Sequence, residues 1–181
     1  MSMVEERYNK GLIILHWLMA VLIIGMIGVG LYMVDIPKGT PNRALIFNLH
    51  KSIGLTIALL VVLRIIWRAR HTPAPLPATM TPVMVAVAKL THVVLYVCMV
   101  LMPLSGFVGS QFNKYGVTVF GLFKIPPMGP ESKDLYELFQ DVHEVTANIL
   151  MVIIALHVLA GLKHLIIDKD GVFQRMLPGK N

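Results

Sequence analysis

The chain has 181 residues, of which 56% are hydrophobic and only 14% are charged, whereas soluble domains carry about 25% charged residues. This composition indicates an integral membrane protein without a soluble domain, so the net charge of +6 does not point to nucleic acid as a partner. The single cysteine, Cys98, excludes an internal disulfide, covalent haem attachment of the c type and a thiolate-rich metal site.

The first long uncharged segment, residues 11–34, is predicted to be a membrane-spanning helix. Its 24 residues exceed the roughly 20 that cross a bilayer. A secretory signal would have an apolar core of about 7–15 residues and a small-residue cleavage site, so we expect this segment to be retained. It carries His16 near its start.

The second and third predicted helices span residues 44–67 and 83–112. The second carries His50 near its start and Arg64 fourteen residues later, which places both on one face of the helix. The segment between the two helices, residues 72–82, contains four prolines and is predicted to be a stiff, extended connector.

The longest predicted loop, residues 113–131, leads into the fourth predicted helix, residues 134–167. Ser132 is a candidate cap for that helix, because serine favours the position just before the first helical turn. Together the four helices predict an all-α, integral membrane four-helix bundle, and a chain of 181 residues is expected to form a single domain.

Three histidines follow one another along the fourth predicted helix. Its uncharged core, residues 145–162, has 18 residues, and His143, His157 and His164 are spaced by fourteen and seven. At about 100° per residue, those spacings return within roughly 40° and 20° of the same direction. The three imidazoles are therefore predicted to lie on one stripe of one helix.

The basic residues indicate how the chain crosses the membrane. Four spans put both termini on one side of the bilayer, and Lys and Arg accumulate in cytoplasmic flanks. Ten basic residues fall on the side of the termini, namely Arg7, Lys10, Arg64, Arg68, Arg70, Lys89, Lys163, Lys169, Arg175 and Lys180. Six fall on the other side, namely Lys38, Arg43, Lys51, Lys114, Lys124 and Lys133. Both termini are therefore predicted to be cytoplasmic.

This topology assigns a depth to four of the histidines. His16 and His157 fall near the inner face, and His50 and His143 fall near the outer face. Two imidazoles that face each other suit a six-coordinate haem iron, with one axial ligand on each side of the ring. The four residues are accordingly predicted to be the axial ligands of two haems, in the pairs His16/His157 and His50/His143.

Other residues are placed to help hold such haems. Arg64 lies on the His50 face at the inner end, where it could bind the propionates of an inner haem, and Lys51 could do so at the outer end. His92 is expected to form a local hydrogen bond or to bind a propionate. His71, in the connector, is assigned no role.

Two alternative roles compete with haem ligation for the histidines. A single histidine in a membrane helix is more often a hydrogen-bonding residue than a ligand, but four in depth-matched pairs favour ligation. A metal transporter is the chief competing function, and its sites usually add Asp, Glu or Cys ligands at one depth. The uncharged cores of the four spans contain no acid, and Asp141 and Glu144 lie only at the outer rim beside His143.

Short motifs distributed along the chain, each weak alone, are specific in combination. They are His16-Trp17, His50 with Gly54, Arg64 followed by Arg68, His143-Glu144, Ala147-Asn148, His157, Lys163-His164, Lys169-Asp170 and Arg175-Met176 with Pro178. By these motifs the chain resembles the bacterial cytochrome b561 family of small dihaem membrane proteins over essentially its whole length.

The resemblance implies a multi-pass protein of the bacterial inner membrane that binds two haems b through His16, His50, His143 and His157. It also implies electron transfer with a ubiquinone-type quinone and, in one branch of the family, the oxidation of superoxide, which makes the protein a membrane oxidoreductase. Related haem subunits serve larger dehydrogenases and hydrogenases. An electron relay that depends on a protein partner therefore stays open as the second function.

His164 is the candidate residue for the quinone site. It lies seven residues beyond His157, on the same face and about 10 Å nearer the cytoplasm. Reduction of a quinone needs protons, and histidine is the side chain that titrates near neutral pH. We therefore expect a quinone head group near His164, with Lys163 and Arg64 close by; a propionate hydrogen bond or a purely interfacial position is the alternative role for His164.

Overall fold

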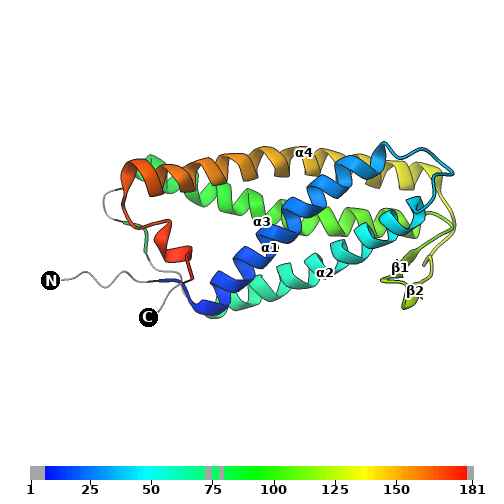
Figure 1. Ribbon diagram of the computed structural model, residues 1–181, viewed down its shortest axis with the longest axis horizontal. Helices are drawn as coiled ribbons and strands as arrows, with labels where there is room; N and C mark the ends of the chain where they lie inside the picture. The colour runs from blue at the N-terminus through cyan, green and yellow to red at the C-terminus, as the bar shows by residue number, and fades with distance from the viewer. Residues whose placement is uncertain (1–6, 72–74, 78–79, 179–181) are drawn as a thin grey trace.

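The computed structural model describes residues 7–71, 75–77 and 80–178. The predicted connector 72–82 lies partly outside these residues, and Lys180 lies wholly outside them. The described chain forms four long helices, α1 (Lys10–Val34), α2 (Arg43–Arg70), α3 (Pro82–Gln111) and α4 (Lys133–Lys163), which run side by side along the molecule (Figure 1). All four are long and apolar enough to cross a membrane, which confirms the all-α four-helix fold.

Capping side chains mark the N-termini of three of these helices. The side chains of Asn9, Thr81 and Ser132 accept hydrogen bonds from the backbone N–H groups of Gly11, Met84 and Leu135, respectively. Each side chain satisfies a donor that the first helical turn leaves without a backbone acceptor. The expected cap at Ser132 is thus confirmed.

The helices pack in sequence order and leave the bundle loosely closed. α1 packs on α2, α2 on α3 and α3 on α4, whereas α4 makes almost no close backbone contact with α1 or α2 within the described residues. The small buried core takes side chains from all four helices and consists of Met19, Ile23, Ile57, Val61, Cys98 and Leu150. α4 therefore meets α1 and α2 mainly through side chains.

The loop between α3 and α4 contains a feature that the sequence did not predict. Strands β1 (Val117–Val119) and β2 (Phe123–Ile125) form an antiparallel hairpin, in which Thr118 pairs with Lys124. Ser52 of α2 ties this hairpin to the bundle, because its hydroxyl donates to the Thr118 carbonyl (3.2 Å) and accepts from the Phe120 N–H (2.8 Å). We call this end of the bundle the hairpin end.

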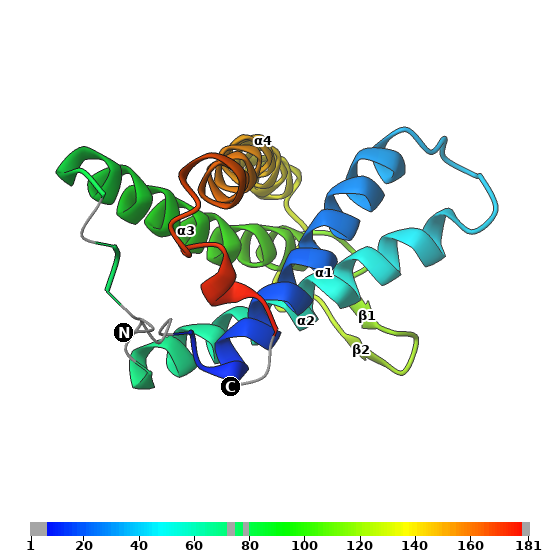
Figure 2. The same cartoon turned by 60° about the vertical axis from the view of Figure 1, so that its left-hand side comes forward.

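The first and the last described segments of the chain, at the blue and red ends of the coloured ribbon, lie at the opposite end of the bundle, which we call the termini end (Figures 1 and 2). After α4 the chain continues through a π-helical turn, His164–Asp168, and a short 3-10 helix, Gln174–Met176. This tail returns to the start of α1, where the Trp17 indole N–H donates to the Met176 carbonyl (2.6 Å).

Candidate functional site

The structure brings the four predicted ligand histidines together as two pairs. His16 of α1 and His157 of α4 have ring centroids 6.1 Å apart at an interplanar angle of 71°. His50 of α2 and His143 of α4 have ring centroids 6.3 Å apart at 69°. α4 thus supplies one imidazole to each pair, and the first pair lies towards the termini end while the second lies towards the hairpin end.

Both pairs lie between α4 and the helices α1 and α2. All four imidazole side chains are only half-buried although they face one another across the bundle. Each pair joins α4 to α1 or α2, although the backbone of α4 makes almost no close contact with either helix among the described residues. Half-buried imidazoles that face each other are well placed to bind one ligand between them.

The surroundings of the His50/His143 pair orient one ring and leave room for the other. Nδ1 of His143 lies 2.9 Å from the Met102 carbonyl oxygen and 3.2 Å from the Ser105 hydroxyl, so the opposite ring nitrogen, Nε2, is free for ligation. A Cβ at Gly106 would lie 3.1 Å from the His143 ring, and one at Gly30 would lie 3.5 Å from the His50 ring. Glycine therefore lets a helix approach each imidazole closely.

The His16/His157 pair has polar neighbours of a different kind. A guanidinium nitrogen of Arg64 lies 3.1 Å from Nδ1 of His16, and Nε of Arg64 donates to the Tyr96 hydroxyl (3.1 Å). His92 of α3 lies with its ring centroid 5.4 Å from that of His157, and its Nδ1 lies 2.7 Å from the Ala88 carbonyl oxygen. Three imidazoles thus meet near the termini end.

Comparison with known proteins identifies the family. The family model described as prokaryotic cytochrome b561 matches residues 7–179. The chain belongs to the prokaryotic cytochrome b561 family. It is 32% identical over 175 residues to cytochrome b561 homolog 2 of Escherichia coli (strain K12), covering 95% of this chain and 92% of that protein.

Two further relatives match over nearly their whole length. Cytochrome b561 homolog 1 of Escherichia coli (strain K12) is 26% identical, covering 96% of this chain and 98% of that protein. A probable superoxide oxidase, CybB, of Yersinia pestis is 26% identical, covering 97% and 98%. Membership of the cytochrome b561 family implies b-type haem binding and membrane electron transfer in a bacterial multi-pass protein.

The histidine geometry of this cytochrome b561 fits a haem iron between each pair. An imidazole nitrogen binds a transition metal at about 2 Å, and the ring centre lies roughly 1 Å further back, so two ligands of one iron have centroids about 6 Å apart. The observed separations are 6.1 and 6.3 Å. Nδ1 of His50 is buried and has no hydrogen-bond partner among the described residues.

The remaining predicted site residues of the cytochrome lie in several places. Lys51 donates to the Gly116 carbonyl (3.1 Å) and so contacts the hairpin. Lys163 pairs with the Asp168 carboxylate (2.5 Å), and Nδ1 of His164 lies 2.8 Å from an Asp170 carboxylate oxygen. In the described part of the chain, no hydrogen bond or ion pair joins Arg64 to Lys163 or His164.

Sequence reasoning missed two residues near the His16/His157 pair. It expected His92 to form a local hydrogen bond or to bind a propionate; the structure shows a local contact with the Ala88 carbonyl oxygen and, beyond that expectation, places the ring next to His157. It overlooked Tyr96 entirely, although Tyr96 lies four residues after His92 and therefore on the same face of α3. That helical spacing was the available signal.

Proposed function

We propose that this protein binds two haems b and carries electrons across the bilayer from an outer donor to a membrane quinone. The observation that supports this proposal is the presence of two facing histidine pairs on a shared helix. His143 and His157 are fourteen residues apart, about 21 Å along α4, which is most of the thickness of a bilayer core. When bound, the two haems supply reversible one-electron redox centres near each membrane face.

The chain's own residues bind and orient these haems. His50 and His143 are the proposed axial ligands near the hairpin end, and His16 and His157 those near the termini end. Arg64, Lys51 and Lys163 are the proposed basic partners for propionate groups. Arg64 has the strongest support, because its guanidinium already contacts His16.

The proposed donor is superoxide, which arrives at the hairpin end. Its support is the name of the Yersinia pestis relative, a probable superoxide oxidase. Net charge adds no support, because the six basic residues on this side of the chain are matched by six acidic ones, Asp35, Glu131, Asp134, Glu137, Asp141 and Glu144. The proposed reaction is balanced in electrons and protons. Two superoxide ions each give up one electron and become two molecules of dioxygen, and one quinone takes up two electrons and two protons and becomes quinol.

The proposed quinone site lies at the termini end near His164. Its Nδ1 is held by the Asp170 carboxylate, so the opposite ring nitrogen is the one available to deliver a proton. Lys163, paired with Asp168, is its immediate neighbour. Arg64 contacts His16 of the inner histidine pair. Its proposed contribution to the quinone site is the electrostatic field of its positive charge.

The proposal includes the topology and the location of the protein. Both termini are cytoplasmic, the chain is a single domain, and the membrane is the bacterial inner membrane. In this orientation the protons for quinol formation come from cytoplasmic water, and superoxide is oxidised on the outer side.

The deciding experiment mixes the purified protein with superoxide and a short-chain ubiquinone. Reduction of the haems by superoxide, followed by stoichiometric formation of quinol without any other protein, supports the proposal. A chain that carries haem but exchanges no electrons with quinone unless a dehydrogenase is added would instead be a relay subunit.

A further inference from the structure

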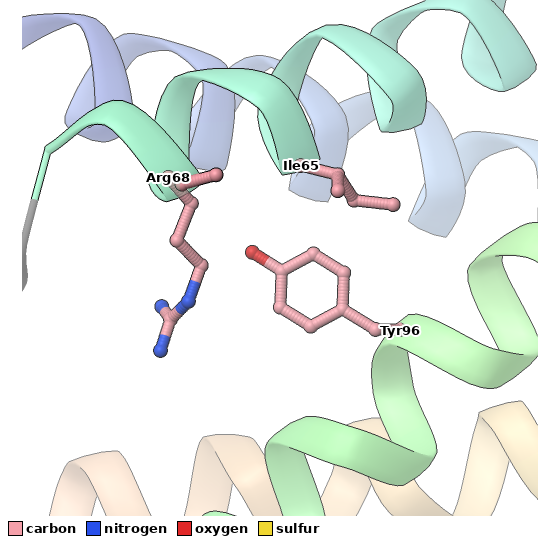
Figure 3. Close-up of a pocket in the computed structure, with 4 residues that line it drawn as sticks. Ile65, Arg68 and Tyr96 are labelled. Carbon is pink, nitrogen blue, oxygen red and sulfur yellow. The ribbon is translucent and has the colours of Figure 1, made fainter.

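A groove between α2 and α3 opens at the termini end; none of the four paired histidines lines it, although Tyr96 connects it through Arg64 to His16. It is a broadly open hollow of about 450 Å³, lined by Ile65, Arg68 and Ala69 of α2 and by Tyr96 of α3. Figure 3 shows the Arg68 side chain beside the Tyr96 ring, whose hydroxyl points back towards α2. Its volume lies within the range of about 300–1,000 Å³ that is usual for ligand sites.

The groove combines apolar walls with a cation at one end. Ile65 is 42% exposed and Ala69 is exposed, so the wall from α2 offers apolar surface. The Arg68 guanidinium lies 5.8 Å from the centre of the Tyr96 ring, a cation–π arrangement that holds it at the groove. Among the described residues, Arg68 forms no ion pair with a carboxylate.

Tyr96 adds a hydrogen-bond donor beside this cation. Its hydroxyl oxygen accepts from Nε of Arg64 at 3.1 Å. A hydroxyl group that accepts one hydrogen bond still has its own proton to donate. The groove therefore offers a guanidinium fork and an O–H donor to a ligand that carries oxygen acceptors and negative charge.

The location of the groove indicates which class of ligand would bind there. Arg68 lies two residues before the end of α2 at Arg70, about 3 Å along the helix axis. The ends of a helix that spans a bilayer are expected near the lipid head groups. Basic pockets between transmembrane helices at this level bind anionic phospholipid head groups. A quinone head is neutral and would not use the full charge of Arg68.

We propose that this groove is a binding site for an anionic phospholipid, with the phosphodiester held by Arg68 and Tyr96 and an acyl chain along Ile65 and Ala69. The lipid fills the space between α2 and α3 and supports the helix turn that carries Arg64 towards His16. This proposal does not depend on the number of haems or on the quinone site, so each can fail without the other.

The test counts phosphatidylglycerol bound to the purified, haem-loaded protein by native mass spectrometry in a neutral detergent. Wild-type protein should retain one molecule about tenfold more tightly than phosphatidylcholine, as expected for a charge-assisted contact. Arg68→Gln should remove that preference, and Arg68→Lys should restore part of it. Arg70→Gln, which removes the same charge two residues away, is the matched control and should bind like wild type.

A second variant distinguishes the effect of the groove's shape from the effect of the Arg68 charge. Ala69→Leu keeps both arginines but narrows the groove, and it should also lose the bound lipid while the haem spectrum stays unchanged. Equal losses in Arg68→Gln and Arg70→Gln would overturn the proposal in favour of diffuse surface charge. The proposal would also be overturned if inorganic phosphate displaced the bound phosphatidylglycerol, or if Ala69→Leu retained it. Haem loss in Arg68→Gln would overturn it as well, because that result would assign Arg68 to a haem propionate.

Discussion

The ring of His92 lies closer to His157, at 5.4 Å between centroids, than the ring of His16 does, at 6.1 Å. The two neighbours of His157 differ in what they bind. Nδ1 of His92 contacts the Ala88 carbonyl of its own helix, whereas His16 contacts Arg64 of α2. The centroid separation of about 6 Å expected for two ligands of one iron favours His16 as the axial partner.

We therefore predict different effects for the two neighbours. His16→Leu should remove the inner haem, because the iron loses an axial ligand, and the haem-to-protein ratio should fall from about two to about one. His92→Leu should keep both haems. Pyridine haemochrome analysis of the purified variants measures these ratios, and haem loss in His92→Leu with retention in His16→Leu would reverse the assignment.

The pairs themselves predict shared phenotypes. His50→Leu and His143→Leu should both remove the outer haem and leave the same residual visible spectrum, because either change leaves the same iron with one ligand. His16→Leu and His157→Leu should share the complementary spectrum. A match between His16→Leu and His143→Leu spectra would contradict the pairing.

Both haems should be removable without breaking a covalent bond. The lone cysteine, Cys98, is buried in the core among apolar residues, so no thiol is available for attachment. Extraction with acidified organic solvent should transfer all of the haem colour, at a ratio of about two haems per chain. Colour that stays with the protein, or a ratio near one, would disprove a dihaem b-type cytochrome.

Gly106 should be specifically required for the outer site. In Gly106→Ala the new Cβ would lie 3.1 Å from the His143 ring, so the imidazole must shift, at a cost of about 1–3 kcal/mol for overpacking. We expect weaker retention of the outer haem on dilution or heating. Gly28→Ala is the control, because its Cβ would meet no atom within 4 Å. Equal haem retention in the two variants would show that the close approach is unimportant.

His164→Ala should keep both haems but slow their oxidation by added quinone. The effect should grow as pH rises, because solvent protons become scarcer and cannot replace the proton that the imidazole delivers. Stopped-flow oxidation of the reduced protein across pH measures it. His71→Ala is the matched control, a histidine at the same end whose Nδ1 contacts the Trp67 carbonyl oxygen. Unchanged kinetics in His164→Ala would leave His164 with a structural role.

Much of this architecture could be predicted because its signals are local in the sequence. Hydrophobic length predicts a spanning helix, and spacings of seven and fourteen keep His143, His157 and His164 on one helix face. The serine before α4 predicts its start for the same reason. The hairpin was missed because strands of three residues carry little pattern, and its stability comes from a contact with Ser52, which is distant in the sequence.

The sequence by itself determined the four helices that are long enough to span a membrane and the position of each histidine along its helix, because rise and periodicity along a helix are fixed by backbone geometry. Only the tertiary structure decided how each helix is rotated about its axis and what it faces, because that depends on the packing of side chains from all the helices. It brought His92 to His157, placed Arg64 against His16 and Tyr96, and joined His164 to Asp170 across a π-helical turn. It also opened the groove at Arg68, because the packing of α2 against α3 leaves that space unfilled.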